Sequence, residues 1–311
     1  MSKTKISNEA YIKESNLILS NKGKTFFWAK FLLKKEHATK AVRLYRFCRY
    51  IDDVGDENVD SALAEKMLKQ IIEEITLGIS NHPVISDAIA LFTESNIDIN
   101  IPISLIHGVM SDSNLVRIKD EEALMVYAYQ VAGTVGLMMS KILDVKNPRA
   151  FSHAIDLGMA MQITNICRDT TEDALMDRRY LPASFIGNIE PGLLISPDKI
   201  TQDKIRKALA KMLNTADQYY QSGYQGLCFL PIRARLGIAI ASGLYRQIGT
   251  NLIKKNYASW LFRSVVSKKM KAWLTIKILM RSLVDPLFYF SVKPHNSKLH
   301  HSIKEIAHSH V

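Results

Sequence analysis

The sequence contains few of the residues that interrupt helices. It has 14 glycines and 9 prolines among 311 residues, about 7% where soluble proteins average about 12%. An interior glycine costs a helix about 1 kcal/mol and a proline about 3 kcal/mol, so a chain poor in both is expected to be mostly helical. No stretch alternates polar and apolar residues as a half-buried strand does. The sequence therefore predicts an all-α protein.

Cysteine is also scarce, with only Cys48, Cys167 and Cys228 in the chain. Three scattered cysteines cannot build a disulfide framework, and their spacing matches no zinc motif. The first fifteen residues lack the apolar core of a secretory signal. We therefore expect a reduced, cytoplasmic setting.

Acidic residues are absent from residues 231–284, although the chain holds 30 of them. Eleven lysines and arginines lie in the same stretch, which matches the formal net charge of +11 for the whole chain. A basic segment of this kind suits an anionic partner, such as a lipid surface or a phosphorylated substrate. No nucleic-acid-binding motif accompanies it, so we expect no nucleic acid partner.

Two apolar stretches approach the length of a membrane span. Residues 123–140 carry no charge over eighteen positions, the lower limit for a transmembrane helix. Tyrosine, glutamine, threonine and glycine dilute this run, so we expect a buried helix that lines an internal cavity. Residues 273–290 are interrupted by Lys277, Arg281 and Asp285, and we expect them to lie on a membrane surface or on the protein body.

Apolar residues recur at helical spacing through most of the chain. No repeat or linker divides it, so we expect one all-α domain over residues 1–290, with its helices around a central cavity. Five of the nine histidines fall between His295 and His310 at spacings that match no metal motif, and we expect residues 291–311 to form a disordered tail. Helices are predicted at about residues 7–20, 38–57, 61–79, 84–96, 102–112, 121–144, 149–175, 203–222, 232–256 and 266–283.

Two pairs of aspartates carry the strongest chemical signal. Asp52 and Asp56 are four positions apart, and so are Asp169 and Asp173. On a helix such residues share a face, where two ionised carboxylates repel by about 3 kcal/mol at an effective dielectric near 20. One such pair could be a solvated helix face, but two pairs beside apolar runs predict bound Mg²⁺, which takes oxygen ligands and shares substrate phosphates.

The residues around the second pair extend this polar stripe. Gln162, Asn165, Asp169 and Asp173 are spaced by three, four and four positions, which places them on one helix face. Arg49 and Arg168 precede the two acidic pairs, and a guanidinium binds phosphate oxygens in a fork. No nucleophile elbow, P-loop or dinucleotide-binding motif is present, so nucleophilic and nucleotide chemistry are unsupported.

Four segments resemble the squalene and phytoene synthase family of head-to-head prenyl transferases, over about residues 20–280. The similarity to bacterial phytoene synthases is greatest in VAGTVGLMM and RRYLP. The resemblance implies the helical isoprenoid-synthase fold, with a central cavity and Mg²⁺ at its mouth. The four segments are LYRFCRYIDDVGDE (44–57), YAYQVAGTVGLMM (127–139), AMQITNICRDTTEDALMDRRYLPAS (160–184) and LPIRARLGIAIASGLYRQIG (230–249).

The resemblance also implies roles for individual residues. Asp52 and Asp56 are expected to bind Mg²⁺ at one diphosphate, and Asn165, Asp169 and Asp173 at the other, with the four aspartates as the catalytic set. Residues 22–25 resemble a substrate-binding segment near the start of the family's proteins, but Lys22 and Gly23 depart from its pattern. Glycine disfavours a helix, so Gly55 is expected to weaken the helix that carries Asp52 and Asp56. The residues expected to bind substrate are Lys24, Thr25, Tyr45, Arg49, Gln162, Asn165, Arg168 and Tyr245.

The family chemistry predicts that two geranylgeranyl diphosphates are joined to phytoene through prephytoene diphosphate, with Mg²⁺ or Mn²⁺ as cofactor and release of diphosphate. One alternative is a squalene, dehydrosqualene or hydroxysqualene synthase that uses farnesyl diphosphate, with NADPH required only for squalene. Another is a non-catalytic lipid-binding or assembly relative, although such a protein should have lost carboxylates that this chain keeps. The hydrophobic product and the basic stretch predict peripheral contact with the inner face of an anionic membrane. Within that stretch, Arg246 and Arg263 are expected to face the diphosphates and not the membrane.

Overall fold

The computed structural model describes residues 17, 31–57, 61–113, 115–290 and 293–306. The substrate residues Lys24 and Thr25 and nearly all of the helix predicted at 7–20 lie outside these residues. Within the described ranges every regular element is a helix, and the one β-type contact is an isolated bridge between Arg117 and Arg179. The predicted all-α class is confirmed.

The helices follow the predicted order along the chain. Most ends lie within a few residues of the expected positions, but two predicted helices contain a break. A π-helical turn interrupts residues 121–142, and the helix expected at 149–175 ends and restarts at Asp169. The elements are α3 (Lys35–Glu57), α4 (Ser61–Leu77), α5 (Pro83–Glu94), α6 (Asn100–Asp112), α7 (Glu121–Ala128), η1 (Tyr129–Gly133), α8 (Thr134–Ile142), α9 (Arg149–Arg168), α10 (Thr170–Leu175), α11 (Ala183–Ile186), α12 (Gly192–Ile195), α13 (Lys199–Gly226), η2 (Leu227–Phe229), α14 (Ile232–Lys254), α15 (Lys268–Ser282), η3 (Pro286–Phe288) and η4 (Ser297–Ile303).

Polar side chains define where several helices begin. The carboxylates of Asp120 and Asp198 accept hydrogen bonds from backbone amides three residues later, at 2.8 Å each, at the starts of α7 and α13. Ser267 does the same at the start of α15, at 3.2 Å. Each cap satisfies an amide that has no partner inside the helix.

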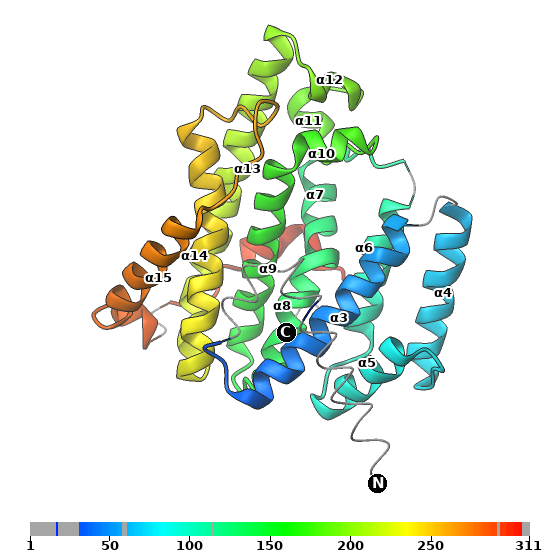
Figure 1. The fold of residues 1–311 in the computed structure, drawn as a ribbon, viewed down its shortest axis with the longest axis vertical. Coiled ribbons are helices and arrows are strands. Elements are labelled where there is room, and N and C mark those ends of the chain that lie inside the picture. Colours follow the sequence, from blue (N-terminus) through cyan, green and yellow to red (C-terminus); the bar gives the residue numbers. More distant parts are fainter. Residues whose placement is uncertain (1–16, 18–30, 58–60, 114, 291–292, 307–311) are drawn as a thin grey trace.

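Helix α9 occupies the centre of the molecule (Figure 1). It packs on α13 and α14 on one side and on η1 and α8 on the other. Its buried residues lie all around the helix, which is typical of a helix surrounded by others. Residues Glu121–Ile142 are long and apolar enough to cross a bilayer, but 56% of the apolar window is buried in the protein, as expected for a core helix.

Glycines let the central helices approach each other closely. A Cβ atom on Gly158 would lie 2.1 Å from the Ala132 carbonyl oxygen, and one on Gly136 would lie 2.1 Å from the Ala154 carbonyl oxygen. Gly55, which was expected to weaken its helix, lies within a continuous α3, and a Cβ there would lie 2.7 Å from Val109 Cγ1. Its small size therefore allows α3 to pack on α6.

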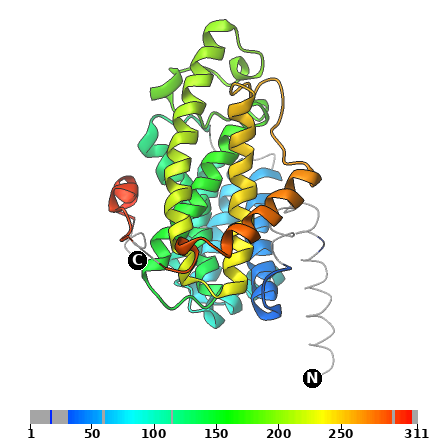
Figure 2. The same ribbon diagram turned by 90° about the vertical axis from the view of Figure 1, so that its left-hand side faces the viewer.

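Residues 293–306, the described part of the tail that was predicted to be disordered at 291–311, are folded against the bundle. Residues 291–292 and 307–311 lie outside the described residues. Residues 297–303 form the 3-10 helix η4, seen at the edge of the bundle in Figure 2, and Ile303 is fully buried. The Tyr219 hydroxyl donates a hydrogen bond to the Leu299 carbonyl oxygen. His295 and His300 both bond to the buried Asp156 of α9. These contacts between distant parts of the chain order a segment that has little apolar content of its own.

Candidate active site

The two aspartate pairs meet at one polar pocket of about 250 Å³. Asp52 and Asp56 reach it from α3, while Asp169 and Asp173 reach it from the junction of α9 and α10. Gln162 and Asn165, two turns and one turn before that junction, line the same pocket. The structure thus brings together six of the predicted residues from two distant segments. Their roles in metal and substrate binding stay predictions.

The second pair is held across a helix break rather than on one straight helix. Asp169 caps α9 at φ −98° and ψ 15°, and α10 begins at the next residue. The Thr170 hydroxyl donates to the Ile166 carbonyl oxygen at 3.1 Å, and the Asp173 amide donates to the Asp169 carbonyl oxygen at 2.8 Å. These bonds carry the chain through the break, so both carboxylates still face the pocket.

The carboxylates in this pocket are crowded. Burial raises the pKa of Asp52 to about 7, and the negative charges of Asp56 and Asp112 add to the effect, although Arg49 opposes it. Burial and the neighbouring Asp169 raise the pKa of Asp173 to about 8. Carboxylates that resist ionisation in this way gain most from a nearby cation.

The donor atoms of the pocket fit a hard cation. Besides the carboxylate oxygens, the buried Oδ1 atom of Asn165 has no hydrogen-bond partner among the described residues. Carboxylate and amide oxygens are ligands that Mg²⁺ accepts, and Mg²⁺ commonly shares its remaining positions with substrate phosphates and water. An oxygen-only donor set is poorly suited to softer metals.

Guanidinium groups surround the same carboxylates. Arg168 Nε donates to Asp169 Oδ1 at 2.7 Å, and Arg263 Nε donates to the same oxygen at 2.9 Å. Arg49 pairs with Asp53 rather than with Asp52. Arg246, which was expected to face the diphosphates, instead pairs with Asp217 on α13. Arg263 thus lies beside a pocket carboxylate, whereas Arg246 does not. The expected contact of Arg263 with a diphosphate stays a prediction.

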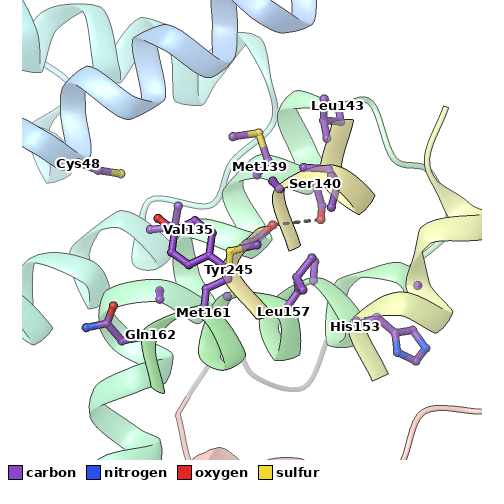
Figure 3. Close-up of a pocket in the computed structure, with 18 of the residues that line it drawn as sticks. Cys48, Val135, Met139, Ser140, Leu143, His153, Leu157, Met161, Gln162 and Tyr245 are labelled. Carbon is purple, nitrogen blue, oxygen red and sulfur yellow. Dashed lines mark hydrogen bonds between the residues drawn. The ribbon is translucent and has the colours of Figure 1, made fainter. Parts of the chain in front are cut away.

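An apolar cavity of about 260 Å³ adjoins the polar pocket. Asp52, Val131, Gln162 and Asn165 line both, so the two spaces lie side by side. Figure 3 shows Gln162 and His153 at opposite ends of the cavity. The remaining wall is built mainly from aliphatic side chains of α8, α9 and α14.

Two predicted substrate residues lie in the wall of this cavity near its acidic end. Tyr45 and Tyr245 both line it. Burial raises the pKa of Tyr45 to about 12 and also raises the pKa of Tyr245. Both phenols therefore stay protonated at neutral pH and can donate a hydrogen bond.

Sequence reasoning missed four polar residues of the pocket. Asp112 accepts hydrogen bonds from the hydroxyls of Tyr127 and Tyr180, each at 2.7 Å, and burial raises the pKa of Asp112 to about 6. Arg178 Nη1 donates to Asp56 Oδ1 at 2.9 Å. Arg178 and Tyr180 lie within the RRYLP segment, which was quoted only for its resemblance. Asp112 has no partner at helical spacing, so no local pattern indicates it.

The matches to known proteins agree with this architecture. The family model for squalene/phytoene synthase matches residues 19–271. A phytoene synthase from Pseudescherichia vulneris is 31% identical over 282 residues, which cover 86% of this chain and 90% of that protein. A 15-cis-phytoene synthase from Enterobacter agglomerans is 33% identical over 269 residues, covering 81% of this chain and 90% of that protein.

Solved structures share the fold. A crystal structure of a dehydrosqualene synthase in complex with ligand superposes with a TM-score of 0.77 at 24% identity, covering 90% of this chain and 99% of that one. Squalene synthase HpnC from Alicyclobacillus acidocaldarius gives a TM-score of 0.70 at 16% identity, covering 81% and 96%. The helical isoprenoid-synthase fold expected from the sequence is confirmed. Taken with the family match, the facing aspartate pairs and the adjoining cavity, these likenesses show that the chain belongs to the squalene/phytoene synthase family of head-to-head prenyl transferases.

Proposed function

We propose that this enzyme joins two molecules of geranylgeranyl diphosphate to form phytoene, through prephytoene diphosphate. One observation carries the proposal: the aspartate pairs form a polar pocket that shares part of its wall with an apolar cavity. Such a site suits a substrate with a charged head and a long hydrocarbon tail. The choice of phytoene is supported by relatives named phytoene synthase that match most of the chain.

Enzymes of this family generally depend on a divalent metal, and here we assign it as Mg²⁺, with Mn²⁺ as a substitute. Asp52 and Asp56 would hold it on one side of the pocket, and Asn165, Asp169 and Asp173 on the other. When bound, Mg²⁺ supplies Lewis-acid assistance to the departure of diphosphate.

The protein itself orients the substrate and excludes water from the reacting atoms. Arg168 and Arg263 hold their guanidinium groups beside Asp169, and the charge of Arg49 acts on Asp52. These groups can bind diphosphate oxygens through paired hydrogen bonds. The aliphatic wall of the adjoining cavity excludes water from the allylic cation that forms when diphosphate leaves. Tyr45 and Tyr245 line this cavity, and their protonated hydroxyls can donate hydrogen bonds to diphosphate oxygens.

The product of the purified enzyme tests this assignment. We expect Mg²⁺ and geranylgeranyl diphosphate to yield phytoene and diphosphate without NADPH, as measured by chromatography of the extracted lipid. Farnesyl diphosphate should react poorly. A dehydrosqualene or hydroxysqualene product from farnesyl diphosphate, or squalene formed only with NADPH, would replace the assignment with the shorter-chain alternative. No diphosphate release from either substrate would indicate a non-catalytic relative.

We further propose that α15 rests on an anionic membrane at the cytoplasmic face. Trp273, Ile276 and Met280 follow one another at helical spacing and are 54%, 62% and 61% exposed. The exposed lysines 268 and 269 lie at the start of the same helix, which crosses the outside of the bundle (Figure 2). An apolar face beside basic residues is typical of helices that lie in a membrane interface.

Vesicle sedimentation tests the membrane contact. Replacing Lys268 and Lys269 with glutamine should weaken binding to vesicles that contain phosphatidylglycerol by about 30-fold, since each lysine near the surface contributes about 1 kcal/mol. Turnover in detergent should not change. The matched control replaces Lys66 and Lys69, which are exposed on α4 on the other side of the bundle (Figure 1). Equal binding by both variants and the parent would exclude the proposal.

A further inference from the structure

A second polar cluster lies on α9, away from the aspartate pocket. Asp156 is fully buried, and its two carboxylate oxygens bond to two histidines of the C-terminal segment. Oδ1 lies 2.8 Å from His300 Nε2, and Oδ2 lies 2.8 Å from His295 Nε2. Ser222 of α13 also donates to Oδ2, and its hydroxyl lies 2.9 Å from His153 Nδ1.

The geometry of this cluster resembles a ligand set for a transition metal. One donor atom each from His153, Asp156 and His295 lie within 4.8 Å of one another. The rings of His153 and His295 meet edge to face with centroids 5.2 Å apart, and those of His295 and His300 are 4.5 Å apart. Imidazole nitrogen with carboxylate oxygen is a donor set that zinc favours, whereas Mg²⁺ prefers oxygen alone.

We propose that His153, Asp156 and His295 bind a divalent ion of the zinc class, which fastens the C-terminal segment to α9. Three protein ligands leave the fourth tetrahedral position to Ser222 or water. His300, on the other carboxylate oxygen, orients Asp156 as partners of metal-bound carboxylates commonly do. The ion would join residues 139 positions apart in the chain.

This site is separate from the proposed magnesium site. Thirteen positions separate Asp156 from Asp169, which is about 20 Å along a helix. His153 lines the end of the apolar cavity opposite Gln162 (Figure 3), so the ion would tie the C-terminal segment to the inner wall of the cavity. Its role there is structural, because the cluster offers no contact with the acidic pocket.

Metal binding by the full-length, tag-free protein tests the site. After treatment with a chelator, the protein is titrated with Zn²⁺ in excess Mg²⁺, which occupies the aspartate pairs, and bound metal is counted by mass spectrometry. We expect one zinc ion per chain in the parent protein. His301→Ala, which alters an exposed histidine of the same segment, should bind equally. His295→Ala should lose the ion, and His300→Ala should bind about 10- to 100-fold more weakly.

Hydrogen exchange of residues 293–306 provides a second measurement. Zn²⁺ should slow exchange there in the parent and in His301→Ala, but not in His295→Ala. The proposal is overturned if the parent protein binds no stoichiometric zinc or if His295→Ala still binds it. In either case hydrogen bonds alone hold the C-terminal segment on α9. Neither measurement involves a prenyl diphosphate, so failure here leaves the proposed reaction untouched, and failure of that reaction leaves this site untouched.

Discussion

The two polar regions along α9, the acidic pocket and the histidine cluster, shift the pKa of a buried aspartate in opposite directions. At the acidic pocket, burial and the neighbouring Asp169 raise the pKa of Asp173 to about 8. At the histidine cluster, burial alone would raise the pKa of Asp156, but hydrogen bonds from His295 and His300 hold it below its usual value. Burial is common to both regions, so the neighbours decide the charge state.

The difference separates a site whose carboxylates repel one another until a cation binds from one whose carboxylate has hydrogen-bond donors even before an ion binds. In the acidic pocket several carboxylates from different helices line one space, and the proposed Mg²⁺ would relieve their repulsion. In the histidine cluster a single carboxylate is surrounded by donors that the fold supplies. Four predictions test this contrast, in order of decreasing effect.

Removing a carboxylate from the acidic pocket should nearly abolish catalysis. Asp169→Ala is expected to reduce Mg²⁺-dependent diphosphate release about 10³-fold, since a group that stabilises developing charge commonly contributes 10²- to 10³-fold. Release is measured with a coupled diphosphate assay. Asp177→Asn, whose side chain is 70% exposed and pairs with Arg117, is the matched control. Full turnover by Asp169→Ala would contradict the site assignment.

Magnesium binding should strengthen as pH rises. The pKa values of Asp52 and Asp173 are raised to about 7 and 8, so both carboxyl groups keep protons near neutral pH. Mg²⁺ must displace these protons when it binds. Apparent affinity, measured by calorimetry, should be at least about tenfold weaker at pH 6 than at pH 8. Asp173→Asn should flatten this dependence, and equal affinity of the parent at both pH values would contradict the raised pKa values.

The same pKa shifts predict how the metal-free protein responds to pH. The folded state holds protons on Asp52 and Asp173 up to pH 7 or 8, whereas the unfolded chain releases them near 3.8. These two groups therefore lower the free energy of unfolding as pH rises from about 4 to 8. Added Mg²⁺ should then raise the melting temperature more at pH 8.5 than at pH 6.

The smallest effect is expected on α9 between the two regions, two residues after Asp156. Gly158→Ala should lower the free energy of unfolding by about 1–3 kcal/mol, because its Cβ would lie 2.1 Å from the Ala132 carbonyl oxygen. Urea denaturation measures the change. Gly192→Ala is the control, since no atom lies within 4 Å of a Cβ placed there. An unchanged midpoint for Gly158→Ala would mean that η1 and α9 can separate without loss.

Sequence patterns predicted most helices because helical periodicity and breaking residues act over a few positions. The predictions were wrong where the structure departs from what the local sequence pattern indicates. The break at Asp169 lies in a stretch without glycine or proline, and η1 is a π-turn without a proline. Gly55 appeared unfavourable in its helix, but the approach of Val109 from α6 explains it. Arg246 was expected at the diphosphates and lies beside Asp217.

The sequence by itself determined the all-α fold class and the pairing of aspartates four residues apart, since both follow from the geometry of one helix. It also carried motifs specific enough to indicate the family. Only the tertiary structure decided that Asp112 and Arg178 join the acidic pocket and that His295 and His300 reach Asp156. Those contacts join segments far apart in the chain, and the spacing of residues along one helix contains no information about them.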